Sequence, residues 1–393
     1  MRRNATIVGK GPAGLLSASL LVNQGWGCTV IADSDATMSL WSGSFDFYRP
    51  DKQMDSNPWS HIESLAIPLT AQQWGSAWLE LVKVLIDAGI EISSEVPISN
   101  SLSITCTGRL KPVFVVPKWQ YATQELESVW FVAIDGLADS LTLGYAEDFS
   151  RTTGIECRHS QLAAPPGWAP LWSPVKFAAF LDTSRGIDWL IRELGRASLG
   201  IQSDYPLLLP QVTGLRKPSD NLKAISQALS RPIYEYPLVA PSIGGMRVRD
   251  RWQWHLKQKG VKFLNGRVKS LTSNGSVTLD DGRTQKSDIL VLATGGILGG
   301  GIEAGVQGDI SDAISHEPLG SIHSNTSVVE LMTFGHTGPR IDQNIFVVGR
   351  QRSQWDPDIS GSGGALVVAS VHEVVTLIRE SIMQSETLKG GDQ

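Results

Sequence analysis

The stretch ATIVGKGPAGLLSASLLVNQGWGCTVIAD, residues 5–33, decides the fold class of this chain. Residues 5–8 are a short apolar run typical of a buried strand, and residues 9–14 form a tight glycine turn. Residues 15–24 have helical spacing and end at a glycine, and residues 28–32 are a second apolar run. This order predicts a compact βαβ unit. We therefore expect an α/β protein with a Rossmann-like, three-layer, mostly parallel sheet.

The glycines of this unit fit the fingerprint G-x-G-x-x-G at Gly9, Gly11 and Gly14. Gly9 permits the turn, Gly11 lets a phosphate approach the backbone, and Gly14 lets the helix pack on the sheet. The helix N-terminus adds amide donors and a partial positive charge. Asp33 follows about 20 residues later, where an acid accepts the ribose hydroxyls of a dinucleotide. A glycine turn without a ligand is the alternative, but the surrounding strand–helix–strand order favours a dinucleotide site.

Three other glycine-rich stretches are candidates for contact with a flavin. Residues 42–44 read SGS, the buried strand ILVL ends in ATGG, and residues 345–370 read as a strand, a glycine-rich loop and a helix. Each stretch also has a purely structural interpretation: the first as a polar loop, the second as a turn after a strand and the third as a docking helix. Asp46, close to the first stretch, is expected at the surface. The cofactor-binding candidates from these stretches are Ser42, Gly43, Ser44, Thr294, Gly295, Gly349, Asp356, Gly361, Gly363 and Gly364.

Composition excludes several classes of protein. Net charge is −5 without a long basic run, which disfavours a nucleic-acid-binding protein. The three cysteines are far apart and the histidines show no metal spacing, so we expect no metal site in this chain. No apolar stretch reaches the ~20 residues of a membrane span, and Lys10 and Pro12 interrupt the only region resembling a signal peptide.

The chain is expected to divide into two parts. Residues 1–50, 240–310 and 338–393 are assigned to the dinucleotide-binding domain, and residues 51–239 to an inserted α/β middle domain. Within these parts we predict helices over 74–88 and 188–199, a helix from Arg247 to Gly260, and a buried strand over 129–136.

Five stretches spread along the chain form a recognisable set: VGKGPAGLLSASLLVNQGWGCTVI, SGSFDF, IGGMRVRDRWQWHLKQKGV, VLATGGILGGGI and NIFVVGRQRSQWDPDISGSGGALVVASVH. Together they resemble the B-subunit family of the anaerobic glycerol-3-phosphate dehydrogenase complex. The resemblance covers most of the chain in order. It is strong at both ends and weak in the middle.

The resemblance implies a flavin-binding fold of the two-dinucleotide type, with FMN as cofactor. Asp33 keeps FAD as the alternative. It implies two partners, an FAD-carrying dehydrogenase subunit and an iron–sulphur subunit that anchors the complex to the membrane. The implied reaction oxidises sn-glycerol 3-phosphate to dihydroxyacetone phosphate, with electrons passing to the quinone pool. The implied location is cytoplasmic, peripheral at the inner face of the cell membrane through these partners.

Two arginines are singled out by the same resemblance. In many flavin enzymes an Asp follows the glycine that stands at Gly349, whereas this family has a non-acidic residue there, and here it is Arg350. Arg247 matches an arginine of the family and is assigned as the catalytic residue. We expect Arg247 or Arg350 to place positive charge near the reduced flavin and raise its potential.

Two other functions are compatible with the motifs. A stand-alone FAD-dependent oxidoreductase would reduce its flavin with its own small organic substrate. A non-catalytic assembly subunit would be colourless. A protein that binds only nicotinamide is disfavoured, because it has no use for the C-terminal glycine block.

Overall fold

The computed structural model of the protein describes residues 3–47, 57–65, 67–123, 127–140, 143–168, 172–201, 204–272, 275–323, 325–352 and 362–390. Asp356 and Gly361, two of the predicted site residues, lie outside these ranges. None of the helices in the described part of the chain combines the length and the apolar character of a membrane span.

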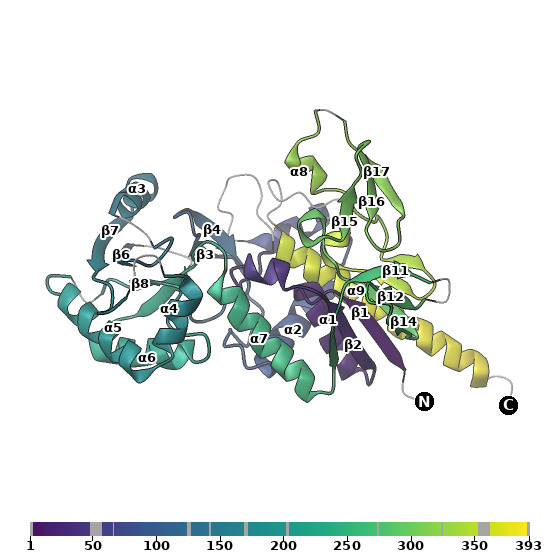
Figure 1. The fold of residues 1–393 in the computed structure, drawn as a ribbon, viewed down its shortest axis with the longest axis horizontal. Helices are drawn as coiled ribbons and strands as arrows, with labels where there is room; N and C mark the ends of the chain where they lie inside the picture. Colours follow the sequence, from purple (N-terminus) through teal and green to yellow (C-terminus); the bar gives the residue numbers. More distant parts are fainter. Residues whose placement is uncertain are drawn as a thin grey trace.

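A six-stranded sheet forms the centre of the part that carries both chain ends (Figure 1). Five of its strands are parallel, and the edge strand β18 runs antiparallel to β19. The predicted βαβ unit is confirmed, because β1 and β2 pair in parallel and the helix Pro12–Asn23 connects them. In spatial order the strands are β10 (Lys262–Asn265), β2 (Gly27–Ala32), β1 (Asn4–Val8), β14 (Ile289–Leu292), β19 (Ile345–Val347) and β18 (Arg340–Asp342).

Side chains alternate between the two faces of this sheet, as pleated strands require. Ile7 and Val291 pack into the larger core beneath the helices, whereas Val8 and Leu292 pack into a smaller core on the other face. The helices of the first face are α1 (Pro12–Asn23), α2 (Ala71–Asp87), α7 (Ile243–Gln258) and α9 (Gly363–Gly390). The second face is covered by the small antiparallel sheet β11 (Val268–Leu271), β12 (Val277–Leu279) and β13 (Thr284–Gln285). The arrangement is the predicted three-layer α/β fold.

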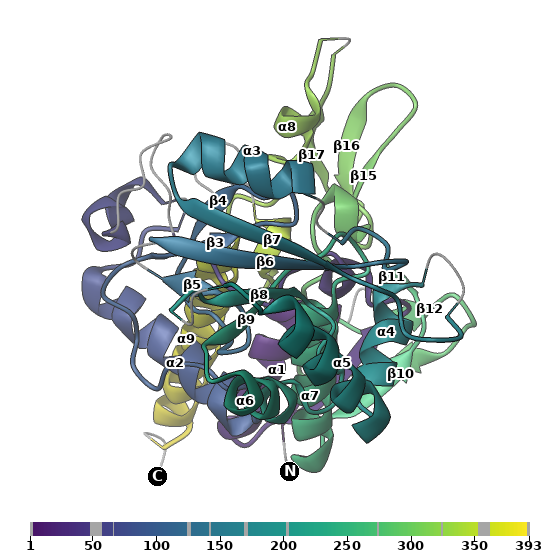
Figure 2. The same ribbon diagram turned by 90° about the vertical axis from the view of Figure 1, so that its left-hand side faces the viewer.

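The middle of the chain forms a second α/β layer (Figure 2). Its four strands are all parallel, which requires helical crossovers between them. In spatial order they are β7 (Glu156–Leu162), β6 (Ser128–Ile134), β8 (Leu207–Pro210) and β9 (Ile233–Tyr236). The helices are α3 (Leu143–Thr153), α4 (Pro174–Leu181), α5 (Ser184–Ala197) and α6 (Pro218–Leu229). An antiparallel sheet of β3 (Ser101–Ile104), β4 (Leu110–Val113) and β5 (Ala122–Thr123) adjoins them.

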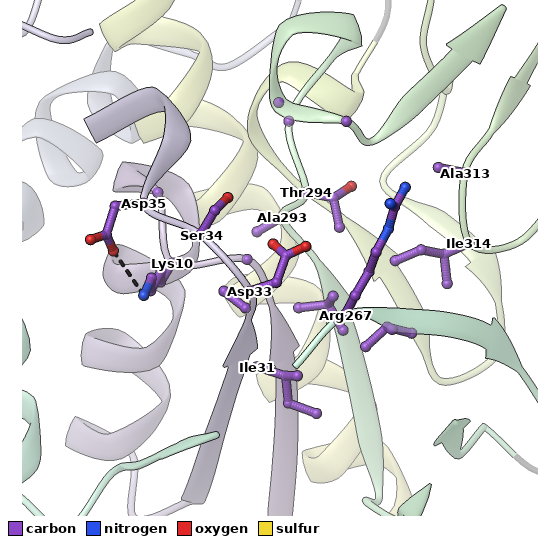
Figure 3. Close-up of a pocket in the computed structure, with 18 of the residues that line it drawn as sticks. Lys10, Ile31, Asp33, Ser34, Asp35, Arg267, Ala293, Thr294, Ala313 and Ile314 are labelled. Atoms are coloured by element: carbon purple, nitrogen blue, oxygen red, sulfur yellow. Dashed lines mark ion pairs between the residues drawn. The ribbon is translucent and has the colours of Figure 1, made fainter. Parts of the chain in front are cut away.

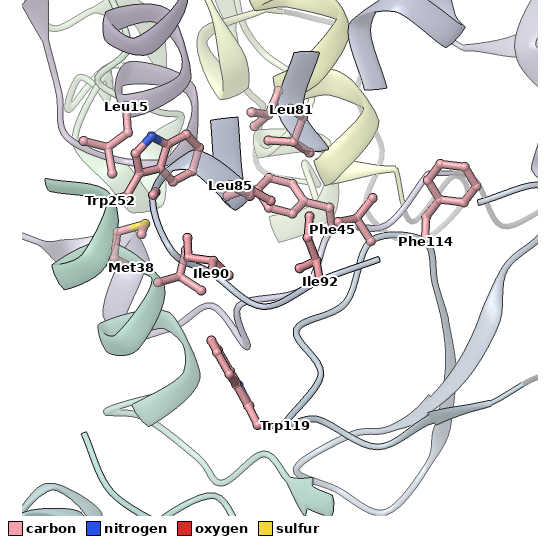
Figure 4. Close-up of a cluster of buried hydrophobic side chains, with 14 of the residues drawn as sticks. Leu15, Met38, Phe45, Leu81, Leu85, Ile90, Ile92, Phe114, Trp119 and Trp252 are labelled. Atoms are coloured by element: carbon pink, nitrogen blue, oxygen red, sulfur yellow. The ribbon is translucent and has the colours of Figure 1, made fainter. Parts of the chain in front are cut away.

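The two parts share one continuous apolar core (Figure 4). Leu15 and Trp252 come from the first part and Ile92 and Trp119 from the second, and all are buried in the same cluster. The exact domain boundaries stay a prediction.

Several helices begin earlier than the sequence-based prediction, among them α1 at Pro12 and α5 at Ser184, which is capped by Thr183. Helix α2 begins three residues early because Thr70 and Gln73 form a capping box. Helix α7 begins at Ile243, capped by Ser242, and takes in a glycine pair that the prediction left outside. A Cβ on Gly245 would lie 2.0 Å from the carbonyl oxygen of Met38, so close helix–loop packing accounts for the glycine.

A small excursion between β14 and β18 was not predicted as structure. It contains β15 (Ile302–Ala304), β16 (Asp309–Asp312), β17 (Pro318–Ser321) and the short helix α8 (Val328–Leu331), and it projects at the top of Figure 1. Asp312 at the end of β16 connects this excursion to the segment that follows it in the chain. The Oδ2 atom of Asp312 lies 2.9 Å from Nε2 of His336 and accepts a hydrogen bond from Nε2 of Gln351 at 2.7 Å.

The described ranges also contain short 3-10 segments at η1 (Ala36–Ser39), η2 (Pro58–Ser64), η3 (Ile297–Gly299) and η4 (Gly349–Gln351).

Candidate dinucleotide site

The glycine turn between β1 and α1 is held against the next strand of the sheet. Gly9 has φ +110, and a Cβ there would lie 2.2 Å from the carbonyl oxygen of Ala293. A Cβ on Gly14 would lie 2.0 Å from the carbonyl oxygen of Gly9. Gly11 is the N-cap of α1 and provides no side-chain hydrogen bond. No side chain therefore caps the first amides of α1. The turn that precedes them requires a glycine at Gly9, and the helix that follows requires one at Gly14.

A cavity of about 420 Å³ opens beside this turn, at the carboxyl ends of β1, β2 and β14 (Figure 3). In open parallel sheets this edge is where ligands bind. The predicted residues Gly9, Gly11, Asp33, Thr294 and Gly295 all line the cavity. The other lining residues include Lys10, Asp35, Gly266, Arg267, Val268, Leu298 and Ile314.

Two polar side chains of the cavity lack partners of their own. Asp33 directly follows β2 and is exposed, and no hydrogen bond or ion pair engages its carboxylate within the described ranges. The hydroxyl of Thr294 is buried without a hydrogen-bond partner. Buried polar atoms are rarely left unsatisfied, so Thr294 points to a ligand group or a water in the cavity.

The remaining charges are engaged. Asp35 forms ion pairs with Lys10 at 2.8 Å and with Arg249 of α7 at 2.7 Å. Arg267 lies on another wall, 3.6 Å from Glu303 of β15. Because Asp35 neutralises Lys10, the positive potential for a phosphate comes mainly from the amides at the start of α1. Lys10, Asp35 and Arg267 were not among the predicted residues, although Lys10 lies inside the glycine fingerprint itself.

The Ser42–Ser44 segment does not line the cavity. Gly43 has φ +93, and a Cβ there would lie 3.1 Å from the carbonyl oxygen of Gly244 in α7. The hydroxyls of Ser42 and Ser44 are 2.8 Å apart. The segment therefore runs over the start of α7, and its predicted contact with a flavin stays a prediction.

The C-terminal block approaches the glycine turn from the other side of the sheet edge. Gly349 has φ +66, its amide donates to Ser370 of α9 at 2.8 Å, and a Cβ there would lie 2.8 Å from that of Ala13. Gly363 begins α9, and the amide of Gly364 donates to the carboxylate of Asp46 at 2.7 Å. Asp46 is half-buried, so its expected place on the surface was wrong.

Arg247, the predicted catalytic residue, does not line the cavity. Its side chain is fully buried and pairs with Glu235 of β9, with its Nε donating to the carbonyl oxygen of Gly214 at 2.7 Å. Sequence reasoning could not find Glu235, because the pair joins two parts of the fold. The catalytic role of Arg247 stays a prediction, and these contacts favour a structural one.

The fold and this cavity define a protein of the Rossmann-type dinucleotide-binding class. Among curated proteins the chain is similar to the B-subunit of the anaerobic glycerol-3-phosphate dehydrogenase of Pectobacterium atrosepticum, with 23% identity over 97% of this chain and 99% of that protein. The protein of the same name from Yersinia pestis is 26% identical over 77% of each chain. The resemblance predicted from the motifs is confirmed. No protein-family model matches the chain.

Solved structures are more distant. A 2-methyl-3-hydroxypyridine-5-carboxylic acid oxygenase aligns over 96% of this chain and 86% of its own, with 10% identity and a TM-score of 0.36. The tryptophan 5-halogenase MibH covers 96% of this chain and 66% of its own, with 12% identity and a TM-score of 0.35. Likeness at this level carries no information about function.

Proposed function

We propose that this chain is the flavin-containing subunit of an anaerobic glycerol-3-phosphate dehydrogenase complex. The observation that carries the proposal is the cavity at the glycine turn, combined with relatives of that name along nearly the whole chain. In this role the chain takes part in oxidising sn-glycerol 3-phosphate to dihydroxyacetone phosphate. The two electrons released pass to the quinone pool.

Two features of the cavity support FAD rather than FMN as the cofactor. Asp33 offers an unengaged carboxylate that could accept hydrogen bonds from the hydroxyls of an adenosine ribose. FMN does not contain this ribose. The uncapped amides at Gly11 and beyond suit a diphosphate. We therefore propose FAD as the cofactor, which reverses the order of the two candidates derived from the sequence.

A bound flavin would supply the capacity to accept two electrons and release them singly. The chain's own residues would bind and orient it. The glycine turn would hold the phosphates, Asp33 the ribose, and the segments at Thr294–Gly296 and Gly349 would border the part nearer the ring. We propose that an FAD-carrying dehydrogenase subunit and an iron–sulphur membrane-anchoring subunit are the partners, which would place the chain at the inner face of the cell membrane.

The test is to purify the chain, record its visible spectrum, release any cofactor with acid and identify it by mass. FAD is the expected result. FMN would support the flavin role but remove the ribose function of Asp33. No flavin, even after incubation with FAD and with FMN, would overturn the proposal.

A second measurement separates the complex subunit from a stand-alone oxidoreductase. The flavin-loaded chain is mixed with sn-glycerol 3-phosphate without partners, and its absorbance is followed. We expect slow or no bleaching, because the proposed electron path runs through partner subunits. Rapid bleaching by this or another small substrate would favour the stand-alone enzyme.

A further inference from the structure

Asp46 lies where three separate segments of the chain meet. Its carboxylate accepts from the amide of Gly364 at 2.7 Å, and its carbonyl oxygen accepts from the amide of Ala365 at 2.9 Å. These amides belong to the first turn of α9, a helix of 28 residues. The start of this helix is therefore occupied by an acid from the other end of the sequence, 318 residues away.

The contact is built closely enough to require a glycine. A Cβ on Gly364 would lie 2.4 Å from the carbonyl oxygen of Asp46 and 2.7 Å from its nitrogen. The backbone of Asp46 thus packs directly against the start of α9, and the carboxylate has little freedom to turn away. Lys111 of the neighbouring strand β4 also reaches it, with Nζ 3.5 Å from Oδ2.

Arg350 is a further charged group near Asp46, in addition to Lys111. Burial lowers the pKa of its guanidinium to about 10, and the negative charge of Asp46 opposes that fall. The backbone of Arg350 lies against the Thr294–Gly296 loop, since a Cβ on Gly296 would be 3.3 Å from its carbonyl oxygen. The loops after β2, β14 and β19 and the start of α9 therefore converge near Asp46 and the half-buried Arg350, with Lys111 beside Asp46.

We propose that Asp46 is a positioning residue of the flavin site. It fixes the start of α9 and sets the electrostatic surroundings of Arg350 at the ring end of the flavin site. The inference rests on the proposed flavin function. The physical consequence is a pair of opposed charges: Arg350 favours the more negative, reduced state of the flavin, and Asp46 disfavours it.

This arrangement predicts opposite effects on the midpoint potential of the flavin. In Asp46→Asn the amide oxygen still accepts from Gly364 while the charge is lost, so the potential is expected to shift upward. In Arg350→Gln it is expected to shift downward, and Arg350→Lys, which keeps the charge, should restore most of it. Asp188→Asn, at an exposed site on α5, removes the same charge elsewhere and should leave the potential unchanged.

The measurement is a spectroscopic redox titration of each FAD-loaded chain against a reference dye, with thermal unfolding of the flavin-free chains alongside. A potential in Asp46→Asn equal to that of Asp188→Asn would overturn the inference while leaving the flavin function intact. A wild-type chain that takes up no flavin would instead overturn the proposed function, and this inference with it. If Asp46→Asn fails to fold, the Arg350→Gln and Arg350→Lys pair decides: equal potentials in both would also overturn the inference.

Discussion

The guanidinium of Arg247 and the carboxylate of Glu235 form a fully buried ion pair that joins α7 to β9. Glu235 also accepts from the amide and the hydroxyl of Thr213, at 2.8 and 2.6 Å, and Arg247 stacks over Trp119. Every oxygen of the carboxylate is thus engaged. The pair connects the helix layer of the six-stranded sheet to the parallel sheet of the middle region.

Arg247→Ala is expected to destabilise the protein by about 3–5 kcal/mol, because it leaves the buried charge of Glu235 without its partner. Chemical denaturation of the flavin-free chain measures the loss. Arg158→Ala is the matched control, since Arg158 pairs with Glu156 at the surface and should cost about 0–1 kcal/mol. Equal losses in the two variants would contradict the structural role assigned to the buried pair.

Replacing the buried pair as a unit gives a second check on that role. The double variant Arg247→Met with Glu235→Leu should be less destabilised than Arg247→Ala, because no unpaired charge remains in the core. If flavin binding and potential also survive in the double variant, the catalytic role predicted for Arg247 is wrong.

Gly14→Ala is expected to abolish flavin binding and to lower stability, because the new methyl group would lie 2.0 Å from the carbonyl oxygen of Gly9. Gly75 in α2 provides the contrast, since a Cβ there meets nothing within 4 Å. Gly75→Ala should stabilise the protein by about 0.5–1 kcal/mol through helix propensity. Flavin titration and thermal unfolding of both variants test the pair. Normal flavin affinity in Gly14→Ala would rule out the turn as the phosphate site.

Asp33→Ala should weaken FAD binding by about tenfold or more, the loss expected for hydrogen bonds to a charged acceptor worth about 1.5–3 kcal/mol. Binding of FMN should not change, because FMN has no second ribose for Asp33 to hold. Equilibrium titration of the apoprotein with each flavin provides the comparison. A parallel loss of affinity for both flavins would show that Asp33 acts on the fold rather than on the ribose.

The Asp312 network predicts a loss of stability in acid. Burial acts to raise the pKa of Asp312, but hydrogen bonds from His336 and from the amides of Ser315 and Ile314 outweigh it, and the pKa falls below its ordinary value. A carboxyl with a depressed folded-state pKa stabilises the protein above its unfolded value of about 4. That contribution is lost as the pH falls through the lower folded value.

Asp312→Asn should therefore be destabilised at neutral pH and show a shallower further loss below about pH 4 than the wild type. Denaturation midpoints measured from pH 7 to pH 2.5 give both curves. Asp342→Asn, at an exposed site on β18, should follow the wild-type curve. Parallel acid curves for the wild type and Asp312→Asn would exclude this network as a source of the pH dependence.

The parts of the fold that sequence could predict are those with local causes. The glycine turn at Gly9–Gly14, the helix after it and the strand that precedes Thr294 each carry their own periodicity and turn residues within a short window. Asp33 could be predicted as a ribose ligand from its spacing after the glycine fingerprint alone. These residues do line one cavity in the structure.

The contacts that sequence could not predict join distant segments. Nothing near Arg247 in the sequence indicates Glu235, and nothing near Asp46 indicates Gly364. Such pairs depend on how the helices pack on the sheets, which a pattern of single residues does not encode. The excursion at 302–331 was missed for a different reason: its strands are three or four residues long, too short to give a clear alternation.

The order of the strands in the central sheet differs from their order in the sequence, and this has a consequence during translation. The turn at Gly9 packs against Ala293, directly after β14, a strand that is synthesised long after β1. During translation the first βαβ unit leaves the ribosome long before the strands that complete the cavity wall. The cavity takes its lining from residues between Val8 and Ile314, so a chain cut short before β14 would retain its glycine fingerprint and lack the residues after β14 that form the other side of the cavity.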